Sequence, residues 1–508
     1  MSWSGRHVLV AGARRTGLSV VDVLLHLGAR VTVADGDQAQ LSTDSALGDR
    51  PVARTRELAA LPDGADLVVT SPGFRTDAPL AVAAREAGVP MVGEPELAWW
   101  LGDDPAVCPD GPPRWLAVTG TNGKTTTTTM LEAILRAAGE DTVACGNIGL
   151  PIVDALRAGH RVLAVELSSF QLEWSPSVRP FAGAVLNLAE DHLDWHGSMA
   201  AYGAAKARVL RGDVAVAGLD DREAAALLIA APAPRHVGFT RGEPEPGQLG
   251  IVDGHLVDRA FAEGVPLAAV TDVAPPGPPG EANALAAAAL ARAHGVAPEA
   301  VAVGLRAVAP GAHRGAVVAE AGGVRWVDDS KATNPHAAAA SLAAHPRVVW
   351  VAGGLLKGAD VGELVVEHRE RLAGAVVLGR DRDRVREALA RHAPEVPVLD
   401  VGGGDDGAVG DTDTDDGMLR AARAAATLAH AGDTVLLAPA AASMDMFRDY
   451  AARGDAFAAA ARVVAGGVGP HGAVSPSDAE QTREHADRGA GPSRPDPRTT
   501  DGASDGAT

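Results

Sequence analysis

The 508-residue chain has few aromatic residues, few cysteines and no excess of basic residues. It contains seven Phe, eight Trp and two Tyr, so Ala, Val and Leu must fill its cores. Its two cysteines, Cys108 and Cys145, can form neither a disulfide framework nor a multi-cysteine zinc site. The 45 basic and 65 acidic residues give a net charge of −20, which argues against a general binder of nucleic acid or anionic membranes. A phosphate-bearing ligand must therefore be held locally, by loops, helix ends, a few cations and metal ions.

Long apolar segments are also lacking. The apolar stretch from Val8 to Val10 is too short for a signal-peptide core, and no later run has the length needed to span a membrane. We therefore expect a cytoplasmic protein without membrane insertion. With 46% hydrophobic residues the chain can still bury sizeable cores, and its length suggests about three domains.

Short β-branched runs alternate with Ala- and Leu-rich helical stretches, which indicates an α/β fold with parallel sheets covered by helices. We expect a Rossmann-like N-terminal domain (1–105), a central P-loop ATPase-type α/β domain (114–310) and a C-terminal Rossmann-like domain (311–468). Residues 231–280 are rich in Pro and Gly and predict irregular segments or short strands. Residues 469–508 have almost no large apolar residues, so we expect a disordered tail.

The strongest local signal is the segment Thr119-Gly-Thr-Asn-Gly-Lys-Thr125, which lies between an apolar strand and a helical stretch. A chain of this kind can wrap backbone N–H groups around a phosphate at a helix N-terminus. Lys124 would reach the terminal phosphates, and the Thr125 hydroxyl would ligate magnesium. Val118 stands where the general pattern has its first glycine, so the segment is a variant P-loop. We interpret it as a site for a nucleoside triphosphate; the alternative is an ordinary glycine turn before a helix.

A second glycine loop lies near the N-terminus, where Gly12-Ala-Arg-Arg-Thr16-Gly17 resembles half of a dinucleotide fingerprint. Arg14 replaces the middle glycine, which argues against close passage of a dinucleotide pyrophosphate and against an NAD oxidoreductase. Asp35 and the turn Ser71-Pro72-Gly73 each follow a predicted strand. These features fit a nucleotide-carrying ligand docked at strand ends, although simple tight turns would look the same.

A carboxylate, an imidazole and a lysine follow the P-loop in order: Glu166, His192 (after Asp191) and Lys206. Hard oxygen ligands with one imidazole suit magnesium that retains several waters. Taken singly, each residue has an ordinary structural role, as a core-edge carboxylate, a helix cap, a packed imidazole or a solvated lysine. Their positions at strand ends behind a P-loop favour a functional role for Glu166 and His192.

Together these motifs resemble the Mur ligases of peptidoglycan synthesis. The segments Thr119–Thr125, Glu166–Gln171 and Glu190–Asp194 match three family motifs in the expected order. The third domain adds the family-like segments His313-Arg314, Asp328–Asn334, Gly353–Gly358 and Leu437–Phe447. The resemblance covers residues 5–465, and the run Asp329–Asn334 and the segment Pro439–Ser443 are most similar to the ligases that use D-glutamate.

The resemblance implies an ATP-dependent ligase that adds D-glutamate to UDP-N-acetylmuramoyl-L-alanine. The L-alanyl carboxylate would attack the γ-phosphate of ATP, and the amine of D-glutamate would then open the acyl phosphate. The implied cofactors are ATP and two Mg²⁺ ions, and the implied process is cell-wall biogenesis, on which cell shape and division depend. We expect a monomer that binds no nucleic acid.

The resemblance also implies a role for each matching residue. The expected catalytic residues are Lys124, Glu166, His192, Lys206 and Lys331. The residues expected to bind ATP are Gly120, Thr121, Asn122, Gly123, Lys124, Thr125, Thr126, Asn283, Arg314 and Asp329. Those expected to bind the UDP-substrate are Gly12, Thr16, Asp35, Ser71, Gly73, Asn147 and Ser168. Those expected to bind D-glutamate are Thr333, Lys357, Ser443 and Tyr450. The expected metal ligands are Thr125, Glu166, His192 and Lys206, the last if CO2 carbamylates its amine.

The sequence departs from the family pattern on the adenine side. The family's His-Asn-x-x-Asn is replaced by Ala282-Asn283-Ala-Leu-Ala286, so only Asn283 is carried over. One alternative is another Mur ligase, or a folylpolyglutamate synthetase-like enzyme, with a different acceptor; the segment Asp328–Asn334 argues against it. A second is a non-catalytic protein that senses UDP-sugar precursors, which the changes at Ala282 and Ala286 leave open.

Overall fold

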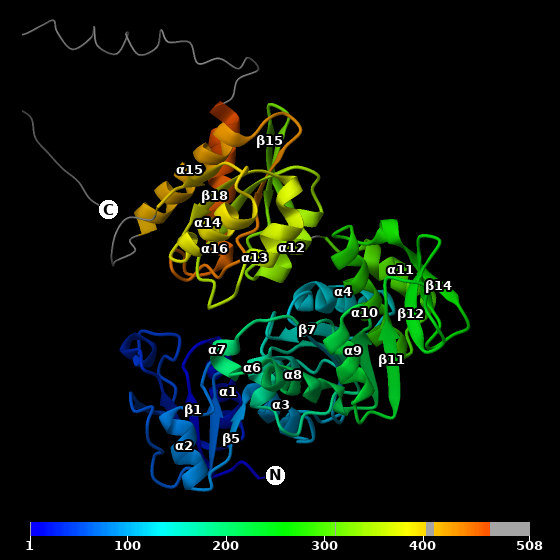
Figure 1. Cartoon of the computed structure of the whole chain (residues 1–508). Coiled ribbons are helices and arrows are strands. Elements are labelled where there is room, and N and C mark those ends of the chain that lie inside the picture. The colour runs from blue at the N-terminus through cyan, green and yellow to red at the C-terminus, as the bar shows by residue number, and fades with distance from the viewer. Residues whose placement is uncertain (1, 310, 403–410, 468–508) are drawn as a thin grey trace, which may run out of the picture.

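Three α/β domains, each built on its own sheet, make up the computed structural model (Figure 1), which describes residues 2–309, 311–402 and 411–467. The three sheets lie within residues 7–93, 114–269 and 316–437. The three-domain α/β architecture expected from the sequence is therefore confirmed. The expected tail, 469–508, lies outside the described residues. None of the described helices is long and apolar enough to cross a membrane.

The N-terminal domain contains a five-stranded parallel sheet in the order β3-β2-β1-β4-β5. Its strands are β1 (His7–Ala11), β2 (Arg30–Ala34), β3 (Ala53–Thr55), β4 (Leu67–Thr70) and β5 (Met91–Gly93). Its helices are α1 (Arg15–His26), η1 (Gln38–Leu41), α2 (Pro79–Glu86) and α3 (Glu94–Gly102). Since the strands are parallel, the loops that follow β1, β2 and β4 meet at one edge of the sheet.

The central domain contains a nine-stranded sheet in the order β14-β13-β12-β11-β10-β9-β6-β8-β7. Its strands are β6 (Arg114–Thr119), β7 (Thr142–Gly146), β8 (Val162–Glu166), β9 (Ala182–Val185), β10 (Val214–Gly218), β11 (Arg235–Phe239), β12 (Gln248–Val252), β13 (His255–Asp258) and β14 (Val265–Ala269). Its helices are α4 (Lys124–Ala137), α5 (Ile152–Arg157), α6 (Ser169–Glu173), α7 (Leu193–His196), α8 (Met199–Ala207), η2 (Arg208–Arg211), α9 (Arg222–Ile229), η3 (Val270–Asp272), α10 (Pro278–His294) and α11 (Pro298–Arg306). Residues 231–280 thus contain four short strands, of which β13 pairs antiparallel with both β12 and β14.

The first two domains share a hydrophobic core. Along β6, Trp115 and Ala117 face a cluster that includes Val20 of α1 and Leu97 of α3, whereas Leu116 and Val118 face the cluster under α4 and α10. Alternate residues of a strand point to opposite faces, so β6 is buried on both sides. A continuous core between two domains stabilises their relative position, because separating them would expose apolar surface to water.

The C-terminal domain contains a six-stranded sheet in the order β15-β16-β20-β17-β18-β19. Its strands are β15 (Ala316–Ala321), β16 (Val324–Asp328), β17 (Val348–Gly353), β18 (Leu372–Leu378), β19 (Val398–Asp400) and β20 (Thr434–Leu437). Its helices are α12 (Pro335–Ala343), α13 (Gly362–His368), η4 (Arg369–Arg371), α14 (Arg382–His392), α15 (Asp411–Leu428) and α16 (Tyr450–Gly467). The sheet is parallel except for the β15–β16 hairpin.

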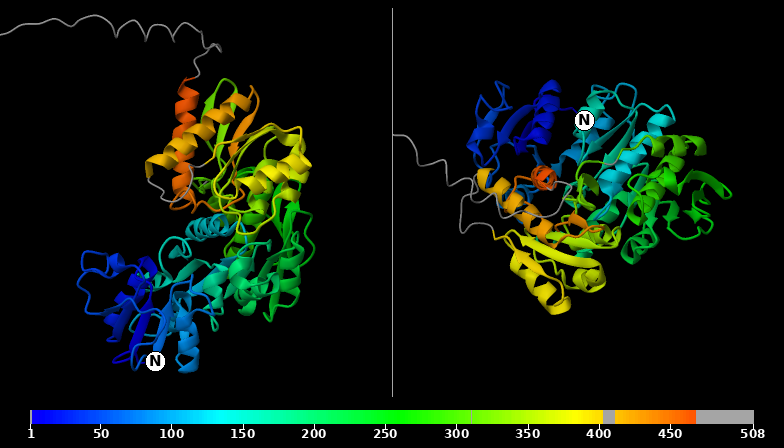
Figure 2. Two further views of the ribbon diagram at one scale, coloured as in Figure 1. Left: turned by 60° about the vertical axis from the view of Figure 1, so that its left-hand side comes forward. Right: turned by 90° about the horizontal axis from the view of Figure 1, so that it is seen from above.

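The C-terminal domain lies against the central domain and, in the views of Figures 1 and 2, apart from the N-terminal sheet. Polar side-chain contacts join it to the P-loop. Asn334 donates through Nδ2 to Oδ1 of Asn122 at 3.0 Å, and an Nη1 of Arg314 lies 3.4 Å from Oγ1 of Thr126. The fold therefore brings the segment after β16 to the start of α4.

Candidate active site

The P-loop connects β6 to α4 and ends at Gly123, which has a left-handed backbone with φ of +85°. A Cβ at this position would collide with Oδ1 of Asn283, which itself accepts a hydrogen bond from Thr127 at 3.2 Å. Glycine is therefore required both by the backbone conformation and by the close approach of α10. This contact places Asn283 at the P-loop, as the resemblance implied. Asn122 N–H donates to Oδ1 of Asn187 at 2.9 Å, which fixes the loop against the segment after β9.

Two lysines reach the same backbone carbonyl of the P-loop. Nζ of Lys124 donates to the carbonyl oxygens of Gly120 and Thr121, both at 2.8 Å, and Nζ of Lys206 donates to that of Gly120 at 2.7 Å. Lys206 is 1% exposed and lies 4.5 Å from the centre of the Tyr202 ring. Burial lowers the pKa of both amines, and that of Lys206 falls well below its ordinary value because Lys124 also repels its charge. Anionic phosphate would relieve this crowding of cations.

Glu166 ends β8 with a buried carboxylate that is only half satisfied. Its Oε1 accepts from Nδ2 of Asn147 at 2.7 Å, whereas its Oε2 is buried and has no hydrogen-bond partner among the described residues. A buried carboxylate oxygen without a partner is costly, so it indicates a ligand that the polypeptide does not itself supply. A cation coordinated by this oxygen would provide that partner.

His192 lies at the start of α7 with φ of +56°, an uncommon conformation for a residue other than glycine. Its Nε2 lies 3.4 Å from Oδ2 of Asp191, and its ring packs edge-on against Phe170. Burial lowers the pKa of His192. A lower pKa favours the neutral imidazole, which is the form that binds a metal ion.

The described residues contain no group of three His, Cys, Asp or Glu side chains that could hold a metal by themselves. The donors present near Glu166 are one unpaired carboxylate oxygen, one imidazole and the hydroxyl of Thr125. This set fits Mg²⁺, which usually takes one or two protein ligands and completes its shell with water and substrate phosphates.

The C-terminal domain adds three charged side chains opposite the P-loop: Arg314, Asp329 and Lys331. Burial, with Arg314 nearby, lowers the pKa of Lys331 to about 8. Burial raises the pKa of Asp329 to about 6, although a hydrogen bond from Ser341 and the charge of Arg314 both act to lower it. Nζ of Lys331 lies 3.8 Å from the centre of the Tyr450 ring, a cation–π contact that orients the amine.

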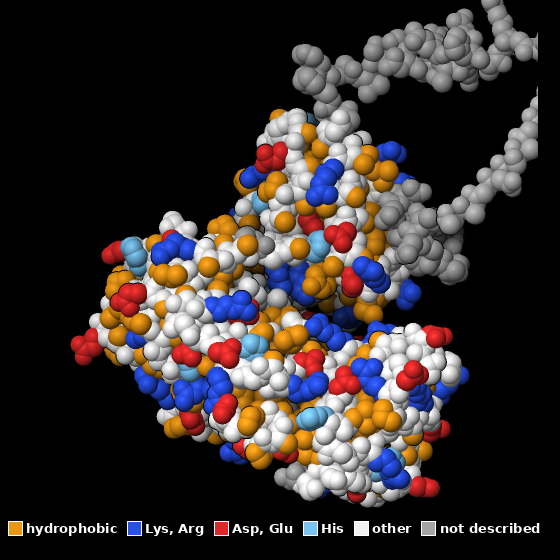
Figure 3. All heavy atoms as spheres, turned by 180° about the vertical axis from the view of Figure 1, so that it is seen from behind, with side chains coloured by type: hydrophobic (Ala, Val, Ile, Leu, Met, Phe, Trp, Pro, Cys, Tyr) orange, Lys and Arg blue, Asp and Glu red, His pale blue; other side chains and the backbone are white. Residues whose placement is uncertain are grey.

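These groups line a cavity of about 330 Å³ between the central and C-terminal domains. From the central domain it is lined by Thr121, Asn122, Gly123, Lys124, Thr125, Asn147, Glu166, Ser168, Phe170, Asp191 and His192. From the C-terminal domain it is lined by Arg314, Asp329, Lys331, Ala332, Thr333, Asn334 and Ala337. Figure 3 shows the molecule hollowed between these domains, with Lys and Arg side chains gathered in the hollow. We refer to this space as the phosphate cavity.

A second cavity, of about 180 Å³, adjoins the first through His192, Thr333 and Asn334, and Lys357 also lines it. Thr333 and Lys357, both predicted to bind D-glutamate, therefore lie together. The other two residues of that set lie elsewhere: Ser443 is buried in the loop after β20, and the Tyr450 ring packs beneath Lys331. Ser443 and Tyr450 are not among the residues that line this second cavity.

The residues predicted to bind the UDP-substrate form two groups. Asn147 and Ser168 line the phosphate cavity, whereas the other five lie in the N-terminal domain: Gly12, Thr16, Asp35, Ser71 and Gly73. The Asp35 carboxylate accepts from the N–H groups of Ala13 at 2.8 Å and Asp37 at 2.9 Å, so it organises the loop after β1. Nε1 of Trp195, in α7, lies 3.4 Å from the carbonyl oxygen of Gly73, which links the two groups.

Sequence reasoning missed two buried residues that support the site. The hydroxyl of Tyr202 lies 3.1 Å from Oγ1 of Thr121 in the P-loop. The guanidinium of Arg453, in α16, donates to Oγ and O of Ser330 and to O of Ala441, all at 2.9–3.0 Å, and so joins two loops of the C-terminal domain. No local pattern marks either residue, because their hydrogen-bond partners lie far away in the chain.

The lysine content of the chain is a further signal of the site. The chain contains only four lysines, and all its other basic residues are arginine. The four are Lys124, Lys206, Lys331 and Lys357; two line the phosphate cavity, one lines the adjoining cavity, and Lys206 donates to the P-loop. A chain that uses arginine everywhere else retains lysine only at this site.

Family models match all three domains. A model described as "Mur ligase MurD-like, N-terminal domain" matches residues 6–93, "Mur ligase middle domain" matches 118–291, and "Mur ligase, glutamate ligase domain" matches 313–441. Among curated relatives, a protein of Rhodococcus jostii named UDP-N-acetylmuramoylalanine--D-glutamate ligase is 57% identical over 89% of this chain and 94% of its own length. Proteins of the same name from Nocardia farcinica and Mycobacterium tuberculosis are 56% and 54% identical, each over 91% of this chain and 98% or 96% of their own lengths.

Solved structures agree with these matches at the level of the fold. The UDP-N-acetylmuramate-alanine ligase MurC of Thermotoga maritima is 17% identical, with a TM-score of 0.54 over 90% of this chain and 99% of its own. A pseudomurein peptide ligase type C of Methanothermus fervidus is also 17% identical, with a TM-score of 0.53 over 85% of this chain and 96% of its own. The domain models and the extent of the sequence identity establish that the chain belongs to the Mur ligase family.

Proposed function

We propose that the chain is the ATP-dependent amide ligase that adds D-glutamate to UDP-N-acetylmuramoyl-L-alanine in peptidoglycan precursor synthesis. The observation that carries this proposal is the phosphate cavity, where the P-loop lysine and the half-satisfied Glu166 face Lys331 of another domain. The names of the relatives that are 54–57% identical supply the identity of the two substrates.

The reaction begins with activation of a carboxylate, which is a poor electrophile. An oxygen of the L-alanyl carboxylate attacks the γ-phosphorus of ATP, the bond to the β,γ-bridging oxygen breaks, and ADP leaves. Both reactants are anionic, so cations must converge where they meet. Lys124, Lys331 and Arg314 supply these charges from two domains. Each positioned charge-assisted contact contributes about 1.5–3 kcal/mol.

The second step forms the amide. The amine of D-glutamate attacks the acyl carbon, the new C–N bond forms, and the C–O bond to phosphate breaks with its electron pair on the phosphate. The amine loses its proton in the process. Thr333 and Lys357 in the adjoining cavity provide a hydroxyl and a cation that suit a dicarboxylate. We assign Ser443 and Tyr450 to the same substrate on the resemblance alone.

Mg²⁺ bound by Glu166, His192 and Thr125 would neutralise phosphate charge during the transfer. Glu166 supports this assignment, because its buried Oε2 has no hydrogen-bond partner among the described residues. We further propose that CO2 carbamylates Lys206, and that a second Mg²⁺ ion takes part. A neutral amine is required for carbamylation, and burial already lowers the pKa of Lys206.

The remaining assignments concern the substrate ends and the organisation of the chain. We propose that Gly12, Thr16, Asp35, Ser71 and Gly73 hold the uridine nucleotide, and that Asn147 and Ser168 hold the muramoyl end. Gly120–Thr126 with Asn283, Arg314 and Asp329 would hold ATP. We place the domains at 1–105, 114–310 and 311–468, and we propose a monomer that acts in the cytoplasm, where ATP is available.

The decisive experiment measures ADP formation from ATP, UDP-N-acetylmuramoyl-L-alanine and D-glutamate, repeated with L-glutamate and with a panel of other amino acids. We expect ADP formation that depends on both the UDP-substrate and D-glutamate, with little turnover for L-glutamate. Preference for a different amino acid would indicate another ligase of the family. Nucleotide binding without phosphate release would indicate a non-catalytic sensor and would overturn the proposal.

A further inference from the structure

A cavity of about 420 Å³ lies at the junction of the N-terminal and central domains, outside the proposed active site. The N-terminal side contributes Trp99 and Gly102 of α3 and the connecting residues Asp103, Pro112 and Pro113. The central side contributes Arg114, Trp115, Arg179, Phe181 and the segment 211–213. Several of these residues lie at or just before the amino-terminal ends of β6, β9 and β10, whereas the P-loop follows the carboxyl end of β6. The two cavities therefore lie at opposite edges of the central sheet.

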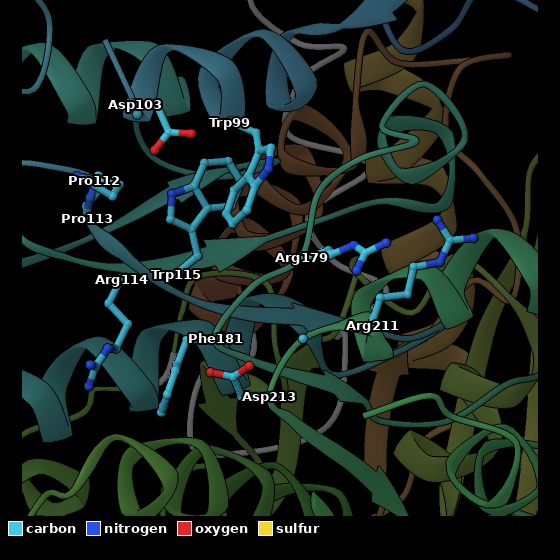
Figure 4. Close-up of a pocket in the computed structure, with 12 residues that line it drawn as sticks. Trp99, Asp103, Pro112, Pro113, Arg114, Trp115, Arg179, Phe181, Arg211 and Asp213 are labelled. Carbon is cyan, nitrogen blue, oxygen red and sulfur yellow. The ribbon is translucent and has the colours of Figure 1, made fainter. Parts of the chain in front are cut away.

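One wall of this cavity is cationic. Figure 4 shows the side chains of Arg179 and Arg211 side by side on this wall. Arg211 donates to the carbonyl oxygen of Pro176 at 3.1 Å, and within residues 2–309 neither arginine forms an ion pair with a carboxylate. Arg208, which precedes Arg211 in the chain, is paired with Glu173 at 3.1 Å. Burial and the charges of Arg208 and Arg179 lower the pKa of Arg211.

The opposite wall is aromatic. Trp99 packs edge-to-face on Trp115 with ring centres 5.3 Å apart, and Phe181 lies under the guanidinium of Arg114 at 4.2 Å. Three of the 17 aromatic residues of the chain thus gather around one cavity. Aromatic and proline side chains with an open face can pack against a planar ring.

The charge balance indicates an anion. The protein carries a net charge of −20, yet Arg179 and Arg211 both line this cavity without a carboxylate partner among the described residues. Asp103 and Asp213 also line the cavity, but neither pairs with these arginines within the described chain. Two guanidinium forks offer more donors than one carboxylate can accept, whereas a phosphate has three terminal oxygens.

We propose that this cavity is a second ligand site, which binds a small phosphate ester of a planar ring. The phosphate lies against Arg179 and Arg211, and the ring packs on the wall formed by Trp99, Pro112 and Phe181. The ligand touches both α3 with its connecting segment and the central sheet. Its binding is therefore sensitive to the relative position of the first two domains.

Phenyl phosphate is the probe that tests this site, with inorganic phosphate and phenol as its two halves. Isothermal titration calorimetry on the full chain should give tighter binding for phenyl phosphate than for either half, by about tenfold over inorganic phosphate. The double variant Arg179→Ala/Arg211→Ala should weaken this binding at least tenfold. Arg222→Ala, which removes an exposed arginine at the start of α9, should leave it unchanged.

Two further variants distinguish binding in this cavity from binding elsewhere on the protein. Lys124→Ala removes the P-loop amine and should not change binding of phenyl phosphate; loss of binding in this variant would place the probe in the phosphate cavity and overturn the proposal. Phe181→Leu should reduce the advantage of phenyl phosphate over inorganic phosphate. Equal affinity for phenyl phosphate and inorganic phosphate would indicate an adventitious ion only. Binding of an acidic peptide but not of phenyl phosphate would also contradict the proposed ligand.

Discussion

Lys124 and Lys206 donate to the same carbonyl oxygen, that of Gly120, at 2.8 and 2.7 Å. Two ammonium groups that share one acceptor repel each other, and burial lowers the pKa of each amine. An anion between them would remove the conflict. The γ-phosphate of ATP can supply it for Lys124, and conversion of the Lys206 amine into an anionic carbamate would reverse the sign of the second charge.

We predict that the activity of the wild-type protein depends on dissolved CO2. Carbamylation requires the neutral amine, and burial, which lowers the pKa of Lys206, favours this form. ADP formation should fall in CO2-depleted buffer and recover when bicarbonate is added. Lys206→Arg should lower the rate about 10- to 100-fold, equivalent to one lost charge-assisted contact, and should not respond to bicarbonate. Full activity of Lys206→Arg, or of the uncharged Lys206→Met, would contradict carbamylation.

A second prediction concerns the pH dependence of ATP use. The pKa of Lys331 in the free protein is about 8, so the amine loses its charge as the pH rises through this value. Because ATP binds the cationic form better, log(kcat/KM) for ATP should fall above pH 8 with a slope approaching −1. Bound ATP stabilises the proton, so kcat should decline only at higher pH. Lys331→Arg stays charged throughout this range, and the decline near pH 8 should be absent from its profile. An unchanged decline in this variant would assign it to another group.

The positions of some strands follow from compact β-branched runs in the sequence. Residues 30–34, 67–70 and 434–437 are short, largely apolar runs of this kind, and they form β2, β4 and β20, which are buried along most of their length. The β15–β16 hairpin was not anticipated. Most residues of β15 are only partly buried or exposed, so its sequence lacks a continuous apolar run.

The site was predictable to the extent that its residues follow strand ends. The P-loop follows β6, Glu166 ends β8 and His192 lies in the segment after β9, and these three strands are parallel neighbours in one sheet, so topology brings the residues together. The partners of Arg453 and Tyr202 depend on tertiary packing between segments far apart in the chain, which no local pattern encodes. The scarcity of lysine is a separate sequence signal. It marks Lys357, which lies on an exposed loop and lines the adjoining cavity, as a candidate residue of the site.

We predict that Lys357→Arg impairs use of D-glutamate although it preserves the charge. Lys357 has φ of +52° and lines a cavity of about 180 Å³, so a larger, planar guanidinium cannot place its charge where the amine lies. The KM for D-glutamate should rise about tenfold in Lys357→Arg and more in Lys357→Ala, by analogy with the loss of one charge-assisted contact. The KM for ATP should not change in either variant. Steady-state kinetics with each substrate varied in turn would show this, and unaltered constants would mean that Lys357 is a solvated loop residue.

The last prediction concerns Glu94, whose buried carboxylate joins the N-terminal and central domains. Oε1 accepts from the N–H of Val153 in α5 at 2.8 Å, whereas Oε2 is buried without a partner among the described residues. Burial raises the pKa of Glu94 to about 7, although hydrogen bonds from backbone N–H groups act to lower it. The folded protein therefore holds this proton more tightly than the unfolded chain, whose carboxyl titrates near 4.5.

The sign of the effect follows from linkage. Between pH 4.5 and 7 the unfolded chain has already released the proton, so the contribution of Glu94 to the free energy of unfolding falls as the pH rises, by about 3 kcal/mol in total. Glu94→Gln keeps an acceptor for Val153 and cannot ionise, so its unfolding midpoint in urea should fall less between pH 5 and 8 than that of the wild type. Glu86→Gln removes an exposed carboxylate on α2 and should follow the wild-type curve. Identical pH dependence for Glu94→Gln and the wild type would show that Glu94 does not stay protonated in the folded protein.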